Sequence, residues 1–375
     1  MDITVVKVGT KAGLADFIRM PWSIYRGNKC WVPPLIKDMK ETLDESRNHT
    51  MGKIDHAMFL AVLDGKAVGR IFTGIDSNLN SKKNMKMGFF SLFECIDSGE
   101  ASNRLFDAAF AWFREKGVDN VIGPVSPTGT DGDEYKGLLI DCFDRPPVIM
   151  NSYNPEYYKR LIEQYGFEKD YDVFAYYMEK DMIFKKDPAR VIEYAQKRYG
   201  FRVDKINLKD IEGEIKAIKH VLDLAVPDEW PDLVAPSLEE VREMAKKLLS
   251  YADSDLIVIA RSGDEPIGFA LALPDYNQVL IRLNGRITPL AAVKYMWYKR
   301  KINSARVFVM FVVPSYRSKG VSFAIYYRVF KNGTDKGYTW GEGSTIGETN
   351  HRMRADIEGF GAQRYKTYRI FKKSV

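Results

Sequence analysis

The chain has 375 residues and a formal net charge of +6, and 45% of its residues are hydrophobic and 28% are charged. These proportions are typical of a globular protein, and the sequence has no apolar stretch of the ~20 residues that a membrane span needs. The cysteines, Cys30, Cys95 and Cys142, are odd in number and scattered, which argues for reduced thiols and against a zinc site.

The start of the chain, residues 1–8, lacks the long apolar core of a signal peptide. Together with the scattered thiols, this start leads us to expect a cytoplasmic protein. The length favours two or three domains. We expect the boundary near residues 182–188, where a proline precedes a helical pattern over residues 189–199. The predicted domains are therefore residues 1–183 and residues 184–375.

A repeated unit fills the chain. An apolar strand, a charged turn and a second strand that begins near a glycine occur in residues 59–72 and again in residues 256–270. The apolar strand predicted over residues 87–95 corresponds to another over residues 307–313. Residues 154–180 likewise correspond to residues 350–373. The sequence therefore predicts two copies of one α/β unit.

The turn that follows the central strand of the first copy is acidic. Residues 96–100 read Ile-Asp-Ser-Gly-Glu. The carboxylates of Asp97 and Glu100 would repel an anionic ligand at this position. We therefore expect the first copy to lack an anion site.

A long segment rich in glycine, proline and acids follows in residues 121–144. A calcium loop is excluded, because Lys136 stands where the loop needs glycine and Cys142 where it needs glutamate. Two roles remain open. The acids and glycines satisfy the backbone of turns, or Asp133 or Glu134 is a buried carboxylate that binds a substrate amine or hydroxyl.

Aromatic and basic residues alternate in residues 286–300, where Leu290, Val293 and Trp297 lie among Arg and Lys. A plain solvated face explains such a mixture, as do contacts with nucleic acid, with an anionic bilayer or with the phosphates of coenzyme A. Among the functional options, the pattern is most typical of an interfacial helix. We expect contact with a membrane surface or a lipid-like substrate, and no nucleic acid partner.

The apolar strand of residues 307–313 ends at Pro314, and a turn containing Gly320 leads into an amphipathic helix. Unpaired backbone N–H groups at a helix start favour an anion such as pyrophosphate. An ordinary strand-to-helix connection is the alternative. The candidate phosphate-binding residues are Arg317, Ser318, Lys319, Gly320, Val321 and Ser322.

This turn resembles the pyrophosphate loop of the GNAT superfamily of acyl-CoA-dependent acyltransferases. Arg317, Gly320 and Ser322 fill the slots of Arg/Gln-x-x-Gly-x-Gly/Ala, with serine in the last. Asn350 fits the asparagine that this family places at the start of the helix after the next strand. Many members have a tyrosine acid seven residues later, where this chain has Ile357.

Over nearly its whole length the chain resembles a group of tandem GNAT-like bacterial N-acyltransferases, some of which are similar to bacterial ceramide synthases. The resemblance implies an α/β fold of two GNAT-like domains, each a mixed sheet flanked by helices, with acyl-CoA bound in the second. It also implies that a backbone N–H of the central strand polarises the thioester carbonyl, at Val312 and Val313.

The sequence offers more than one candidate for the general base, and each candidate base or acid has an alternative structural role. Glu342 and Glu348 lie on or after the strand next to the cofactor, so each is a candidate base, although each is also placed to cap a helix or pair with Arg352. Tyr326 is the candidate acid, and packing inside the helix is its alternative role.

The predicted function is transfer of an acyl group from acetyl-CoA or a longer acyl-CoA to an amine on a small or lipid-like molecule. Two alternatives remain open. A non-catalytic acyl-CoA-binding or scaffold protein would explain the degenerate first copy and the absent tyrosine. A tRNA-dependent aminoacyl transferase would not need the pyrophosphate turn, so the turn favours coenzyme A.

Overall fold

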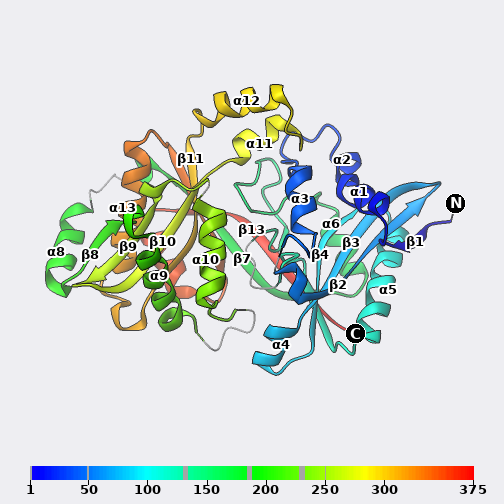
Figure 1. Cartoon of the computed structure of the whole chain (residues 1–375), viewed down its shortest axis with the longest axis horizontal. Helices are drawn as coiled ribbons and strands as arrows, with labels where there is room; N and C mark the ends of the chain where they lie inside the picture. Colours follow the sequence, from blue (N-terminus) through cyan, green and yellow to red (C-terminus); the bar gives the residue numbers. More distant parts are fainter. Residues whose placement is uncertain (1, 49, 130–133, 184–187, 228–232, 250) are drawn as a thin grey trace. The chain divides into compact units, whose positions relative to one another are not determined.

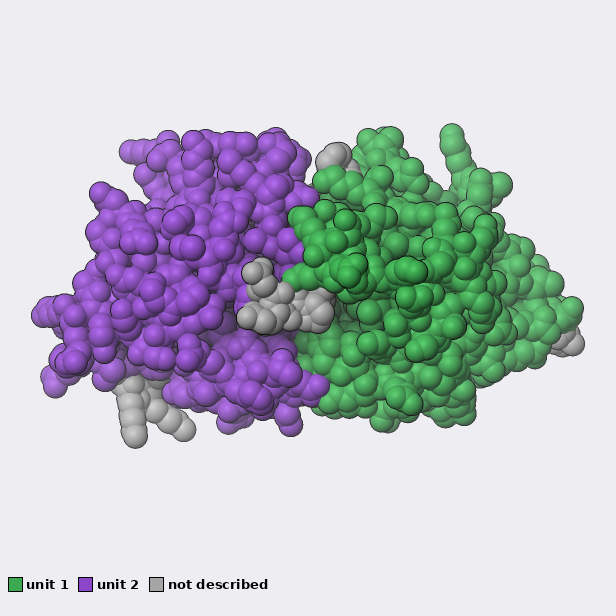
Figure 2. Space-filling model, turned by 90° about the horizontal axis from the view of Figure 1, so that it is seen from below, with its two compact units in different colours: residues 1–173, 277–300, 366–375 green, residues 174–276, 301–365 purple. Residues whose placement is uncertain are grey.

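The computed structural model describes residues 2–48, 50–129, 134–183, 188–227, 233–249 and 251–375 (Figure 1). The chain divides into two compact units, coloured separately in Figure 2. Unit 1 comprises residues 1–173, 277–300 and 366–375, and unit 2 comprises residues 174–276 and 301–365. Each unit thus contains segments that are distant in the sequence. The predicted division into residues 1–183 and 184–375 stays a prediction.

Unit 1 is a mixed sheet with helices. Its strands are ordered β1-β2-β3-β4-β5, and β5 then pairs with the end of β13. The elements are β1 Thr4–Lys7, α1 Lys11–Arg19, α2 Pro21–Ile24, α3 Ile36–Thr42, β2 Ile54–Leu63, β3 Lys66–Asp76, α4 Ser77–Lys83, β4 Met87–Cys95, α5 Gly99–Glu115, β5 Asn120–Gly123, β6 Leu138–Leu139, α6 Tyr158–Gln164, α11 Asn277–Leu283 and α12 Pro289–Lys299.

Unit 2 repeats this plan with the order β12-β11-β10-β9-β8. Its elements are α7 Lys180–Ile183, α8 Ala189–Tyr199, β8 Arg202–Lys205, α9 Ile211–Ala225, α10 Leu238–Leu249, β9 Ile257–Ser262, β10 Glu265–Pro274, β11 Ser304–Val312, α13 Val321–Asp335, β12 Trp340–Gly347 and α14 His351–Gly359. Strands β7 Glu168–Glu179 and β13 Gln363–Ser374 each have residues in both units. The predicted α/β class is confirmed.

The central strands of the two units are built alike. Strand β4 pairs with β5 in parallel only from Met87 to Phe89, and β11 pairs with β12 in parallel only from Ser304 to Val307. Each central strand also has a register shift against its antiparallel neighbour, β3 or β10. Such shifts increase local twist and bend a strand. In both units the central strand therefore parts from its parallel neighbour.

Each unit has its own apolar core. In unit 1, Leu105, Phe106 and Phe110 of α5 are buried against the sheet, at the spacing that places residues on one helix face. In unit 2, Ile325 and Val329 of α13 are buried in the second core. Amphipathic helices thus cover each sheet, as the repeat predicts.

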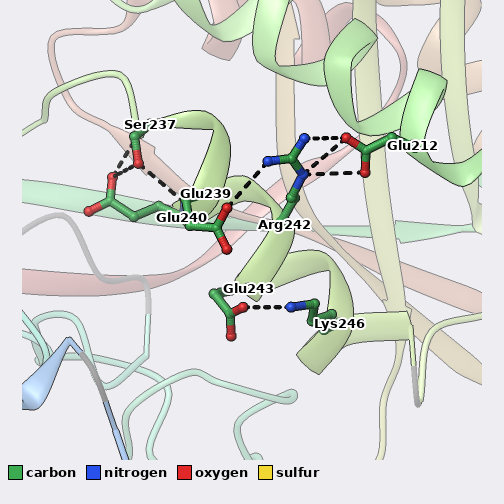
Figure 3. Close-up of polar contacts among 7 residues, drawn as sticks. All are labelled: Glu212, Ser237, Glu239, Glu240, Arg242, Glu243 and Lys246. Atoms are coloured by element: carbon green, nitrogen blue, oxygen red, sulfur yellow. Dashed lines mark hydrogen bonds and ion pairs between the residues drawn. The ribbon is translucent and has the colours of Figure 1, made fainter.

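Helix α10 makes several polar contacts at its surface (Figure 3). The Ser237 Oγ accepts from the Glu240 N–H at 3.3 Å, and the Glu240 Oε2 accepts from the Ser237 N–H at 2.8 Å, which is a capping box. Arg242 donates from Nε to Oε1 of Glu212 on α9 at 3.0 Å. Because these pairs are exposed, they orient the helix and contribute little stability.

Candidate functional site

The turn after β11 adopts the backbone that the sequence predicts for an anion site. A short 3-10 turn, Pro314–Tyr316, follows β11, and Ser318 and Gly320 then have φ values of 64° and 79°. A side chain at Gly320 would be strained by this φ and would place its Cβ 3.2 Å from the Cβ of Ala195. Gly320 immediately precedes α13, and no side chain caps this helix.

The backbone donors of this turn are largely unused. The amides of Arg317 and Lys319 bond to carbonyl oxygens within the turn at 3.2 and 3.4 Å. Within the described part of the chain, no acceptor takes the amides of the four other turn residues, Ser318, Gly320, Val321 and Ser322. Unpaired amides and the helix dipole together favour an anion at the start of α13.

Arg317 holds the turn in place. Its Nε donates to the Val312 carbonyl at 3.1 Å and its Nη2 donates to the carbonyl of Ala225, the last residue of α9, at 2.9 Å. Burial, with a smaller contribution from Arg352, lowers the pKa of Arg317. The sequence predicted only a charge here. The side chain also joins the turn to β11 and α9.

The side chains of Lys319 and Ser322 also have partners within the protein. The Lys319 Nζ lies 4.6 Å from the ring centroid of Tyr316, a cation–π distance. The Ser322 Oγ donates to Oδ2 of Asp356 on α14 at 2.6 Å. The serine in the last slot of the motif thus links α13 to α14 through its hydroxyl, while its backbone amide has no acceptor among the described residues.

The amides at the end of β11 alternate in direction. The Val313 N–H donates to the Ile267 carbonyl at the end of β10 at 2.9 Å. Because successive residues of a strand point their N–H groups to opposite sides, the Val312 N–H points away from β10, toward the side from which β12 has parted. Val312 is therefore the better placed of the two predicted donors.

Glu342 lies in a buried polar network on β12. Glu342 and Arg306 are both 0% exposed. Ser344 Oγ donates to the Glu342 Oε1 at 2.5 Å and accepts from the Arg306 Nε at 2.9 Å, while the Tyr365 hydroxyl donates to Oε2. Both carboxylate oxygens thus have partners. Glu342 is therefore better suited to a structural role than to that of a base, which a substrate must be able to reach.

The other predicted residues of this region surround α14. The Asn350 Oδ1 accepts from the Met353 N–H at 3.2 Å, so Asn350 caps α14. Half-buried Glu348 lies just before this cap, and its carbonyl accepts from Arg354. The Tyr326 hydroxyl is buried 3.0 Å from the Met353 Sδ, and burial raises its pKa, so it is protonated at neutral pH.

Ile357 occupies a core position. It is 0% exposed, and its Cδ1 fills the space beside Gly343. A tyrosine hydroxyl at this site would have to be buried. Of the candidate substrate residues in unit 1, Glu134 is half-buried after β5, and Asp133 lies outside the described residues.

A buried carboxylate in unit 1 was missed by the sequence reasoning. The Glu94 Oε2 accepts from the hydroxyls of Tyr25 and Tyr158 at 2.9 and 2.7 Å, and Oε1 lies 3.7 Å from a guanidinium nitrogen of Arg70. Burial raises the pKa of Glu94. The available signal was charged residues in otherwise apolar strands, because Arg70 is on β3 and Glu94 is near the end of β4.

The described residues contain neither a candidate metal site nor a candidate membrane span. No group of three or more His, Cys, Asp or Glu side chains within the described ranges is arranged to hold a metal ion. None of the helices in the same ranges is both long and apolar enough to cross a membrane.

Comparisons with known proteins cover the whole chain. No family model matches it. It is 27% identical over 388 residues to a protein named Bacterial ceramide synthase from Caulobacter vibrioides (strain NA1000 / CB15N), covering 100% of this chain and 98% of that protein. It is 28% identical over 372 residues to Protein YghO of Escherichia coli (strain K12), covering 97% and 94%.

The fold is also found in solved structures. A tandem GNAT protein from the clavulanic acid biosynthesis pathway has a TM-score of 0.57 at 9% identity, and the match covers 100% of this chain and 98% of that one. At this identity the match shows the fold alone. The resemblance predicted from the sequence is confirmed at that level, and the chain has a tandem GNAT fold.

Proposed function

We propose that the protein is an N-acyltransferase that takes its acyl group from an acyl-CoA and transfers it to an amine, with a lipid-like amine favoured. The supporting observation is the uncapped start of α13, where the amides of Ser318, Gly320, Val321 and Ser322 have no protein acceptor within the described residues. A pyrophosphate is an acceptor of the right charge for that position. The name of the Caulobacter relative supports an amine of the lipid class.

The residues have distinct roles in this proposal. The turn binds the pyrophosphate, while the Val312 N–H donates to the thioester carbonyl and stabilises the oxyanion formed when the amine attacks it. The bond between the carbonyl carbon and sulfur then breaks. The amine loses a proton to a base, and the thiolate takes up a proton as it leaves.

Glu348 is the proposed base, because both oxygens of Glu342 already accept from hydroxyls inside the fold. Glu342 and Arg306 instead shape the strand edge next to the reacting groups. Tyr326 is kept as the proposed acid for its hydroxyl on α13, although burial raises its pKa and makes proton donation harder. Arg317 positions the turn through its two bonds to backbone carbonyls.

The test is thiol release from palmitoyl-CoA in the presence of a long-chain amine and, separately, a short water-soluble amine. Turnover with the long-chain amine, with kcat reduced at least about tenfold by Glu348→Gln and KM little changed, supports the proposal. Glu342→Gln is the matched variant and should retain more of the activity. Binding of palmitoyl-CoA without turnover would contradict it in favour of a non-catalytic acyl-CoA-binding protein.

A further inference from the structure

Helix α12 carries a bare apolar face. Five of the exposed large apolar side chains of the described residues lie within one stretch: Ile287, Leu290, Val293, Met296 and Trp297, at 61, 66, 60, 65 and 54% exposure. On a helix, residues 290, 293 and 297 share one side, and residue 296 adjoins them. Contiguous exposed apolar residues of this kind are unusual on a protein without a partner.

The helix is nevertheless firmly built. Thr288 caps it by accepting from the Ala291 N–H at 3.1 Å, and Pro289 occupies its first turn. Buried Ala291 and half-buried Tyr295 and Tyr298 form the face opposite the bare one. The exposed side chains are therefore presented by a formed helix and not by a frayed end.

The turn before the helix is fixed to the rest of unit 1. The Asn284 Oδ1 accepts from the Trp22 indole N–H at 2.9 Å, and the Gly285 carbonyl accepts from the Ile36 N–H at 2.9 Å. Gly285 has a φ of 75°, and a side chain there would collide with the Trp22 ring. Helices α11 and α12 pack against each other, as Figure 1 shows. The position of α12, and with it of the bare apolar face, is therefore fixed within unit 1.

The charged residues of this stretch of the chain have one sign. The sequence contains no Asp or Glu between Asp275 and Asp335. The exposed basic residues of α11, of α12 and of the segments that adjoin them are Arg282, Arg286, Lys294, Lys299, Arg300 and Lys301. Basic side chains that flank an apolar face complement an anionic bilayer, where apolar groups enter the headgroup boundary and cations meet lipid phosphates. A tryptophan on that face suits the same boundary.

We propose that α12 docks the protein on the surface of an anionic lipid bilayer, with Leu290, Val293, Met296 and Trp297 inserted and the basic residues at the headgroups. The occupant is lipid and not a second copy of the chain, because two such basic faces would repel each other. This inference does not depend on acyl transfer, and its test measures binding alone.

The test is flotation of the full chain with vesicles of phosphatidylcholine alone or mixed with phosphatidylglycerol. We expect binding to the anionic vesicles that weakens as salt rises, and little binding to the neutral ones. Replacing Lys294, Lys299 and Arg300 with Gln should weaken it about fivefold for each charge removed. The apolar variant, with Leu290, Val293, Met296 and Trp297 each changed to Ser, should weaken it at least about tenfold.

The matched control changes two exposed apolar residues elsewhere, Leu208→Ser and Met244→Ser, and should bind as the wild type does. Quenching by brominated lipid should be present in the wild type and reduced in Trp297→Phe. Equal binding by the apolar variant and the wild type would overturn the proposal. So would a wild-type dimer in sedimentation that the apolar variant dissociates, together with no vesicle binding.

Discussion

The two copies of the repeat differ in how their central helix is capped at its N-terminus. In the first copy, the Ser98 Oγ accepts from the Ala101 N–H at 3.2 Å at the start of α5, and Glu100 lies in the first turn. In the second, Gly320 precedes α13 and provides no side-chain cap. The same fold thus has one helix start that its own serine caps and one whose amides have no acceptor among the described residues.

The ends of the central strands, β4 and β11, also differ in whether their polar groups have partners inside the protein. The end of β4 carries buried Glu94, which Tyr25 and Tyr158 hold by hydrogen bonds. The end of β11 carries Val312, whose amide points toward the parted side. At the end of β4, the Glu94 carboxylate would repel a pyrophosphate or an oxyanion at the position that corresponds to Val312. In our proposal, an anion site in this fold depends on which backbone groups the local residues leave unpaired.

The largest expected effect is a loss of stability. It tests whether the second copy, like the first, is stabilised by a buried carboxylate. Glu342→Ala removes the acceptor of Ser344 and Tyr365 and leaves the buried Arg306 guanidinium without that carboxylate in its network. We expect the free energy of unfolding to fall by about 3–5 kcal/mol in denaturant titrations. The half-buried Glu348→Ala is the control, with a loss below about 1 kcal/mol. Equal losses would remove the structural role given to Glu342.

The next effect tests the uncapped turn. Gly320→Ala places a side chain at a φ of 79°, which costs about 1–2 kcal/mol and disturbs the donor amides. We expect coenzyme A affinity to fall about tenfold in calorimetry, on the scale of 1.4 kcal/mol. Gly333→Ala, inside α13, should leave the affinity unchanged, because alanine suits a helix interior. An unaltered affinity in Gly320→Ala would mean that the turn does not bind the donor.

A smaller effect concerns the helix cap of the first copy. Ser98→Ala removes the acceptor for the Ala101 amide and should lower the free energy of unfolding by about 1 kcal/mol. Coenzyme A affinity should not change, because the first copy has no donor site in this account. Weakened binding in this variant, with the fold intact, would show that the two copies are less different than we infer.

The smallest expected effect is the contribution of Glu94 to the pH dependence of the free energy of unfolding. Burial raises its pKa, so the folded state holds the proton more tightly than the unfolded state does. As pH rises from the ordinary glutamate range toward that raised pKa, the unfolded state loses the proton first, and stability falls. We expect Glu94→Gln to lack this fall in denaturant titrations across that range.

Asp172 is the control for Glu94, because its pKa is lowered and its contribution to stability therefore changes with pH in the opposite direction. Its burial favours a higher pKa, but hydrogen bonds from Arg369 and Lys169 outweigh burial and lower the pKa. Its contribution to stability is therefore present above the ordinary aspartate pKa and is lost as pH falls through the lowered pKa. Asp172→Asn should flatten the profile on the acid side, and a Glu94→Gln profile parallel to the wild type would refute the Glu94 account.

Local patterns predicted much of the fold. The central strand expected over residues 87–95 is β4, and the helix expected over residues 189–199 is α8. The helix expected after Asn350 is α14. These elements were predictable because their signals, apolar runs, glycines, prolines and caps, lie within a few residues of each element.

Long-range partners were not predictable. Tyr25 lies 69 residues from Glu94, and Ala225 lies 92 residues from Arg317. The last residues of the chain, 366–375, are part of unit 1, where β13 pairs with β5. Strand pairing and side-chain partners of this kind are set by tertiary packing, which a single sequence does not specify.

The measurement that tests the central claim most directly is a calorimetric titration of the full chain with coenzyme A, acetyl-CoA and palmitoyl-CoA, repeated with Arg317→Glu. Arg328→Glu is the charge-matched control, since this exposed residue lies on α13, the helix that follows the turn. The account predicts one site per chain, affinity reduced at least about 100-fold by Arg317→Glu, or about 2.7 kcal/mol, and little changed by Arg328→Glu. Two sites per chain, or equal affinity in the wild type and Arg317→Glu, would contradict it.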